Sequence, residues 1–273
     1  KSYGPFQNKL YIKIIRKNLN KLQFLQVRGE ENLRSVNKLK LGIPIYSFPD
    51  VSLALEPVDA EWAQNYIENL MPTKNSIIGI SPSVVIRNIS NIANMTSGED
   101  HVELCKQIIS KYCNAHQSIL LIPHSIGNGK NLKTCDLALA RKIYNEIPYN
   151  ENLVLLDDIN LTYQQTRAII GQLNFYITSR YHSLASALKM RIPTISLSWH
   201  IKYKDIMKLY LDKFLTIDCR TKNISEAMNL IDEFYENRDW FSKEVMQKRQ
   251  VGIEKEIGKS IEMIVEDIKK DKL

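Results

Sequence analysis

Residues 175–197 read FYITSRYHSLASALKMRIPTISL, and this stretch indicates the fold class of the whole chain. Its first three residues are apolar and predict a buried strand. Ser183 opens a run of small and apolar residues that predicts a helix, and Pro193 ends that helix before a second strand at 194–197. Strand, helix and strand in this order form one βαβ unit of a parallel sheet.

Arg180 and His182 lie between the first strand and the helix of this unit. In open α/β sheets ligands bind at the carboxyl ends of the strands, and an anion there also meets the free N–H groups of the helix start. Arg180 carries a fork of donors suited to a carboxylate or phosphate, and histidine has an ordinary pKa near neutrality. A structural interpretation stays equally open, in which Arg180 pairs with a structural carboxylate and His182 caps the helix.

The Arg-x-His pair, the small-residue helix, the following Pro-strand and a later lysine resemble the signature of the polysaccharide pyruvyltransferase family. Lys202 and Lys204 are the candidates for that lysine. Three shorter segments follow the family order: SYGPF at 2–6, QVRGE at 26–30 with Ser35, and the Pro-Asp pair at 49–50. The resemblance covers residues 1–215, and the Arg-x-His block is its most specific part.

This resemblance implies a transferase of surface polysaccharide biosynthesis, acting on an exopolysaccharide, capsule or cell-wall polymer. The enolpyruvyl group of phosphoenolpyruvate would move onto two hydroxyls of a sugar or lipid-linked saccharide as a cyclic ketal. His182 is the first candidate for proton transfer and His124 the second, since a histidine can act as acid or base near neutral pH. The implied donor-binding residues are Arg180, Lys204, Lys202, Ser81, Arg87 and Ser183, and the acceptor side holds Gly4, Pro5 and Arg28. Phosphoenolpyruvate is a co-substrate, so no cofactor is expected.

A glycosyltransferase-B-like fold is also implied, with two Rossmann-like lobes that each hold a parallel sheet and flanking helices. Residues 1–70 would form the C-terminal part of the first, acceptor-side lobe and a crossing segment. Residues 71–235 would form the donor-side lobe, and residues 236–273 a helix that packs back on the first lobe. The first lobe is expected to be incomplete, because the chain starts at Lys1 and lacks the family's Gly-rich opening segment.

The remaining sequence predicts the same α/β architecture from its own periodicity. Helices are expected at 9–19, 31–41, 60–70, 99–113, 134–144 and 162–171, and strands at 22–27, 43–48, 77–80, 119–122, 153–156 and around Ile217. Polar pairs follow five strands: Ser81 and Ser83, His124 and Ser125, Asp157 and Asp158, Arg180 and His182, and Ser198 and His200. Because parallel strands end at one edge of a sheet, these side chains are expected to converge there.

Composition narrows the class of protein. The chain is 44% apolar and 25% charged, which is typical of a soluble globular protein. No apolar run is long enough to span a membrane and no signal peptide is legible, so a cytoplasmic location is expected, including the inner face of the membrane. The net charge of +7 suits an acidic small substrate or an anionic membrane surface. Nucleic acid is not expected, because the basic residues are dispersed. No metal site is expected either, since Asp157 and Asp158 lack a third ligand.

Two other functions stay open. A glycosyltransferase of the same fold that uses a nucleotide sugar would carry an acidic residue on the helix after the strand, and residues 183–190 contain none. A non-catalytic relative would bind a sugar or anchor a partner, and the presence of Arg180, His182 and a later lysine weighs against it. The sequence does not specify the acceptor sugar or the oligomeric state.

Overall fold

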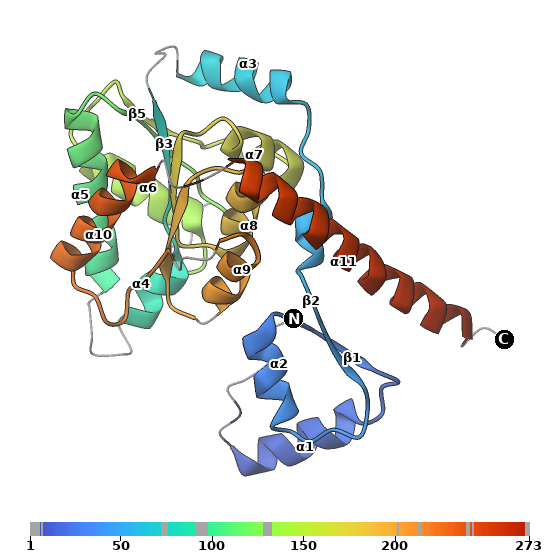
Figure 1. Cartoon of the computed structure of the whole chain (residues 1–273). Helices are drawn as coiled ribbons and strands as arrows, with labels where there is room; N and C mark the ends of the chain where they lie inside the picture. Colours follow the sequence, from blue (N-terminus) through green and yellow to red (C-terminus); the bar gives the residue numbers. More distant parts are fainter. Residues whose placement is uncertain are drawn as a thin grey trace. The chain divides into compact units, whose positions relative to one another are not determined.

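The computed structural model covers residues 1–273 and describes residues 6, 8–71, 76–90, 98–127, 133–200, 202–211, 215–238, 241 and 243–270. The chain divides into two compact units (Figure 1). The first unit consists of 1–55, 201–214 and 244–273, and the second of 56–200 and 215–243. Residues 201–214 therefore join the first unit, whereas the predicted donor-side lobe, 71–235, included them.

The first unit contains a short parallel sheet. Strand β1 (Leu25–Arg28) pairs with β2 (Ile45–Phe48), and helices α1 (Lys9–Leu19) and α2 (Glu30–Asn37) flank the connection. Val36 and Leu39 bury their side chains against β1 in one small apolar core. The short 3₁₀ turn η1 (Val51–Ala54) follows β2. Gly4 and Pro5 lie outside the described residues.

Helices from late in the sequence complete this unit. Helix α9 (Lys202–Tyr210) contacts α2, and the Asp205 side chain accepts a hydrogen bond from the Glu31 N–H. Gly29 begins α2 with φ +79°, and a Cβ atom there would lie 2.8 Å from Asp205. Glycine therefore permits both the backbone conformation and the close approach of α9. In α11 (Lys243–Lys270), Ser260 donates to the Gln26 side chain at 2.7 Å.

The second unit is built on a six-stranded parallel sheet in the order β5-β4-β3-β6-β7-β8. Its strands are β3 (Ile77–Ser81), β4 (Ser118–Leu121), β5 (Leu153–Leu155), β6 (Phe175–Thr178), β7 (Thr194–Ser198) and β8 (Thr216–Asp218). Its helices are α3 (Ala60–Leu70), α4 (Val84–Ser90), α5 (Gly98–Asn114), α6 (Asp136–Glu146), α7 (Tyr163–Ile170), α8 (Tyr181–Lys189) and α10 (Ile224–Glu236). Alternation of strands and helices makes this the predicted α/β architecture.

Side chains of successive strand residues enter two different apolar cores, because neighbours in a strand point to opposite faces. Phe175 and Ile177 pack into the core under α5 and α10, while Tyr176 packs into the core under α3, α7 and α8. Figure 1 shows α5 and α10 on one side of β3 and α7 and α8 on the other. Both faces of the sheet are covered, so its strands are apolar almost throughout.

Local predictions match the structure closely, with three differences, of which the first is that α2 ends at Asn37 rather than at residue 41. Helices α1 and α3 have the predicted bounds, Lys9–Leu19 and Ala60–Leu70. Helix α8 starts at Tyr181, two residues before the predicted start at Ser183, so His182 lies in the first helical turn rather than in an extended loop. Helix α4, over Val84–Ser90, was not among the predicted helices. Within the described ranges, the helices are too short or too polar for any of them to cross a bilayer.

Candidate active site

The candidate site lies at the carboxyl edge of the six-stranded sheet, where the strand order reverses. From β3 the chain adds β4 and β5 on one side, while β6, β7 and β8 lie on the other. Ser81 is in register with Thr178, and the Ser179 N–H donates to the Ser81 carbonyl at 3.0 Å. The loops after β3 and β6 therefore leave the sheet side by side, which is where open α/β sheets bind their ligands.

Asp136 ties three of these loops together. Its Oδ1 accepts from the Val84 N–H at 3.1 Å, and its Oδ2 accepts from the Ser125 N–H at 2.9 Å. The same two oxygens accept from Arg180, Oδ1 from Nη2 at 2.6 Å and Oδ2 from Nε at 2.7 Å. Since Asp136 is fully buried, this carboxylate anchors the ends of β3, β4 and β6 to one point.

One edge of the Arg180 guanidinium pairs with a structural carboxylate, which was one of the two interpretations left open by the sequence. Nε and Nη2 face Asp136, whereas Nη1 makes no hydrogen bond within the part of the chain that the structure describes. The side chain as a whole is 19% exposed. A buried partner that holds one edge fixes the direction of the other, and Nη1 can meet an incoming anion without rearrangement.

The two histidines proposed for proton transfer are neighbours. The rings of His124, after β4, and His182, in α8, stack with centroids 6.3 Å apart and planes 28° apart. His182 is exposed and His124 is half-buried. Burial, followed by the charges of His182, Arg180 and Arg167, lowers the pKa of His124 to about 4. His124 is therefore neutral near pH 7, so only its base form is present there.

Tyr163 supports this pair from α7. Its ring meets His124 edge-on at 6.0 Å, and its hydroxyl donates to the His182 carbonyl at 3.3 Å. The same hydroxyl receives a hydrogen bond from Arg167 Nη2 at 2.7 Å and contacts the Ser186 hydroxyl at 3.1 Å. Arg167 is fully buried and its guanidinium carbon lies 4.8 Å from the Tyr163 ring centroid. Tyr163 and Arg167 form a polar hub under the histidines.

The serines proposed for donor binding are buried at the same edge. Ser183 is fully buried, and its hydroxyl lies 2.5 Å from that of Thr178 and donates to the Arg180 carbonyl at 3.0 Å. Ser81 is also buried, against the hydroxyl of Tyr176. The Ser183 hydroxyl therefore makes its hydrogen bonds within the turn that leads into α8.

The remaining predicted site residues lie on other elements of the chain. Arg87 is half-buried on α4. Lys202 and Lys204 begin α9, and Arg28 forms an ion pair with Asp50; all four belong to the first unit. The donor-site role of the lysines and the acceptor-side role of Arg28 therefore stay predictions.

The aspartates considered for a metal have other partners. Asp157 accepts two hydrogen bonds from Arg141, and Asp158 accepts one from Tyr66. Across the described ranges, no three His, Cys, Asp or Glu side chains gather as a metal site would require.

Sequence reasoning missed Asp136, Tyr163 and Arg167. Asp136 starts α6 directly before the apolar residues LALA. A carboxylate next to core residues was the one sign in the sequence that Asp136 is buried. Tyr163 and Arg167 are four residues apart on one face of α7, a spacing that also fits an ordinary surface pair. Only the burial of Arg167 in the folded chain distinguishes this pair from a surface pair.

The sequence is also similar to a known protein family. A family model described as polysaccharide pyruvyl transferase matches residues 2–201. No curated protein matches the sequence.

Among solved structures, the N-terminal domain of Candida albicans trehalose-6-phosphate phosphatase is similar with a TM-score of 0.54 and 10% identity, over 93% of this chain and 60% of that one. The UDP-GlcNAc 2-epimerase of Neisseria meningitidis bound to UDP-GlcNAc is similar with a TM-score of 0.51 and 10% identity, over 97% and 84%. The chain thus spans three fifths of the first of these two proteins. At this identity the likeness concerns the fold alone, and it confirms the predicted glycosyltransferase-B-like class.

Proposed function

The chain belongs to the polysaccharide pyruvyl transferase family, and on that basis we propose that it transfers the enolpyruvyl group of phosphoenolpyruvate onto two hydroxyls of one sugar. Two C–O bonds form at the central carbon of the donor and its bond to the phosphate oxygen breaks. Of the two hydroxyl protons released, one converts the methylene to a methyl group and the other leaves with phosphate. The product is a cyclic ketal.

The observation that carries this proposal is the Arg180 guanidinium, held at the switch point by Asp136 with Nη1 unpaired. A donor with a carboxylate and a phosphate suits such a cation at a helix start, because the first N–H groups of α8 add to the field. The family resemblance assigns a second cation to Lys202 or Lys204. The departing phosphate gains charge in the reaction, and a fixed cation stabilises that charge without reorganisation.

We assign the proton transfers to the histidine pair. His124 is in its neutral base form near pH 7, and we assign it the proton of the attacking hydroxyl. His182, which is exposed, exchanges protons with water and delivers one to the methylene carbon. Tyr163 contacts both residues and keeps them at this spacing.

A binding experiment separates this proposal from the nucleotide-sugar alternative. Phosphoenolpyruvate and UDP-GlcNAc are titrated separately into the full chain by calorimetry. We expect phosphoenolpyruvate to bind and the Arg180→Lys variant to bind it at least about tenfold more weakly, because lysine has a point charge in place of the fork. Arg141→Lys is the matched control, since Arg141 makes a similar two-bond pair on the surface. Binding of the nucleotide sugar alone would overturn the proposal.

Turnover tests the histidine roles. Phosphate release from phosphoenolpyruvate is measured with a panel of saccharide glycosides as acceptors. His182→Gln and His124→Gln keep hydrogen bonding but carry no proton near neutral pH, so kcat should fall about 10²-fold or more in each with modest loss of donor binding. Full activity of both variants would assign the proton transfers to other groups.

A further inference from the structure

Helix α1 of the first unit carries apolar side chains on two opposite faces. One face packs into the small core of that unit through three half-buried residues, Ile12, Ile15 and Leu19. The other face is open to solvent, where Leu10 is 67% exposed, Tyr11 55% and Ile14 50%. Leu10 and Ile14 each lie two residues from Ile12, which is about 160° round the helix. The packing of the core therefore leaves both side chains uncovered.

Basic residues surround this exposed face. Residues 9–22, which form α1 and the turn after it, contain five exposed basic residues: Lys9, Lys13, Arg16, Lys17 and Lys21. No Asp or Glu occurs among residues 1–29. None of the five basic side chains forms an ion pair with a residue that the structure describes. The helix thus combines an exposed apolar face with positive charge that no carboxylate neutralises.

The boundary between the headgroups and the acyl chains of a lipid bilayer accepts both kinds of side chain. Leucine and isoleucine enter the acyl region, and tyrosine is enriched at the interface because its ring is apolar and its hydroxyl is polar. Lysine and arginine lay their aliphatic stems along the apolar layer and keep their charges in the headgroup region. Each basic residue near an anionic membrane strengthens binding by on the order of fivefold, so the charges of α1 act together.

Other partners fit this surface less well. In a symmetric dimer a second copy would oppose α1 to itself, and five positive charges would meet five. A nucleic acid would pair with the lysines but leave Leu10 and Ile14 in water. An acidic protein would need an apolar patch within a rim of carboxylates. An anionic bilayer presents acyl chains beneath negative headgroups over its whole area.

From these observations we infer that α1 and the turn after it dock on an anionic lipid bilayer. Leu10 and Ile14 enter the acyl boundary, and the lysines meet the headgroup phosphates. The helix lies in the plane of the interface, as amphipathic helices do, and does not cross the bilayer. The inference is independent of the proposed transfer reaction, because it rests on none of the side chains of the candidate active site and is tested by lipid binding alone.

Co-sedimentation of the full chain with vesicles tests the inference. Vesicles of phosphatidylcholine with about one third phosphatidylglycerol are compared with vesicles of phosphatidylcholine alone, in about 0.1 M salt. We expect binding to the anionic vesicles to be at least about tenfold tighter than to the neutral ones. Binding should weaken at least about tenfold in about 1 M salt, because the Debye length falls to about 3 Å. Equal binding to both kinds of vesicle would overturn the inference.

Two charge variants separate α1 from the net charge of the chain. Lys13→Glu/Lys17→Glu should weaken binding to the anionic vesicles at least about twentyfold. Lys248→Glu/Lys255→Glu, at exposed positions of α11, lowers the net charge of +7 by the same four units and should change binding by less than about threefold. Equal losses in the two variants would show only the general attraction of a basic protein, and would overturn the inference.

Two apolar variants test entry into the acyl boundary. Leu10→Ser/Ile14→Ser should weaken binding at least about tenfold. Ile261→Ser/Ile268→Ser changes side chains that are 48% and 50% exposed on α11, and it should leave binding unchanged. All four side chains are exposed, so urea midpoints should show that both variants fold.

Three outcomes would assign the exposed face of α1 elsewhere and overturn the inference. Retained vesicle binding in Leu10→Ser/Ile14→Ser would exclude entry into the acyl boundary. Sedimentation velocity without lipid could reveal a dimer of the unaltered chain that this variant abolishes, which would assign the face to a second copy. Failure of the unaltered chain to bind either kind of vesicle would leave an acidic protein as the partner.

Discussion

Replacing Asp136 by asparagine removes the charge that anchors the candidate site. Each carboxylate oxygen accepts one backbone N–H and one guanidinium N–H, four hydrogen bonds in all. The NH₂ group of the introduced amide would replace one of these oxygens with a donor that faces two other donors. The substitution would also leave the Arg180 charge, 19% exposed, without its counter-charge.

The expected loss of stability follows from these contacts. Hydrogen bonds to a charged group contribute about 1.5–3 kcal/mol each, and breaking a buried ion pair from one side costs about 3–5 kcal/mol. Because the pair is screened from water, and one guanidinium bond and one backbone bond are lost together with the counter-charge, we expect the free energy of unfolding to fall by about 3–5 kcal/mol. That is a large fraction of the about 5–15 kcal/mol typical of a folded domain.

Urea unfolding followed by tryptophan fluorescence measures this loss. With an m-value near the upper end of about 1–3 kcal/mol/M, the midpoint should shift by at least about 1 M. Asp157→Asn is the control, because Asp157 makes the same two-bond contact with Arg141 while both side chains are about two-fifths exposed. An exposed pair contributes at most about 1 kcal/mol.

Comparing the unfolding free energies of Asp136→Asn and Asp157→Asn tests whether Asp136 anchors the strand ends. If Asp136→Asn costs no more than Asp157→Asn, Asp136 does not anchor the strand ends and Arg180 is positioned by other groups. A double-mutant cycle with Arg180→Gln adds a second criterion. Coupling below about 1 kcal/mol would contradict a direct interaction between the two charges.

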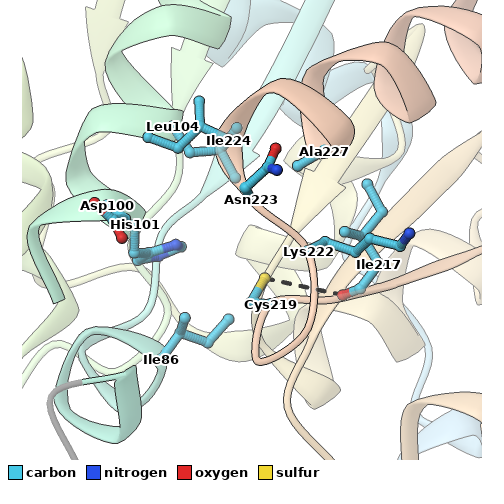
Figure 2. Close-up of a pocket in the computed structure, with 10 residues that line it drawn as sticks. All are labelled: Ile86, Asp100, His101, Leu104, Ile217, Cys219, Lys222, Asn223, Ile224 and Ala227. Carbon is cyan, nitrogen blue, oxygen red and sulfur yellow. Dashed lines mark hydrogen bonds between the residues drawn. The ribbon is translucent and has the colours of Figure 1, made fainter. Parts of the chain in front are cut away.

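Three further outcomes are expected. The buried His101 of α5 (Figure 2) has a folded pKa of about 4, below its unfolded value near 6.5, so the unfolded chain binds more protons there. Its contribution to stability should fall by on the order of 3 kcal/mol as pH drops from about 6.5 to 4. His124 has the same folded pKa, so urea midpoints in His101→Gln should keep about half of the pH dependence of the unaltered chain, and an unchanged dependence would contradict the burial of His101. Gly79→Ala places a Cβ 2.4 Å from a packed side chain and should destabilise the fold by about 1–3 kcal/mol. Gly258 lies on a helix with open space around it, so Gly258→Ala should stabilise the fold by about 0.5–1 kcal/mol. Thermal unfolding that ranks the two variants in the opposite order would contradict the packing. Tyr163→Phe keeps the ring but leaves Arg167 without its phenol acceptor, so a loss of about 1–3 kcal/mol is expected by urea unfolding, and an unchanged midpoint would argue against the polar hub.

The local pattern of residues in the sequence was sufficient to predict most of the helices and strands. Apolar periodicity and flanking Gly and Pro residues predict α1 and α3 to the residue, and they predict strands at all eight observed positions within a few residues. The early start of α8 could not be read from the sequence, because Tyr181 and His182 are neutral in helix propensity. The residue before the helix, Arg180, has an extended backbone, and its side chain makes no hydrogen bond to the helix N–H groups. Assignment of α9 to the first unit depends on contacts across 170 residues of chain, such as Asp205 with Glu31.

For the candidate site, sequence pattern was enough to identify which side chains stand at strand ends: Arg180, His182, His124 and Ser81. That follows from the alternation of strands and helices, which brings every parallel strand end to one edge. The groups that these side chains meet depend on tertiary contacts. Asp136 reaches Arg180 from 44 residues away.

The neutral states of His124 and His101 likewise depend on burial and on charges from other loops. Charge and hydrogen-bond energies depend on distance and on the exclusion of water, and neither quantity exists until the chain has folded.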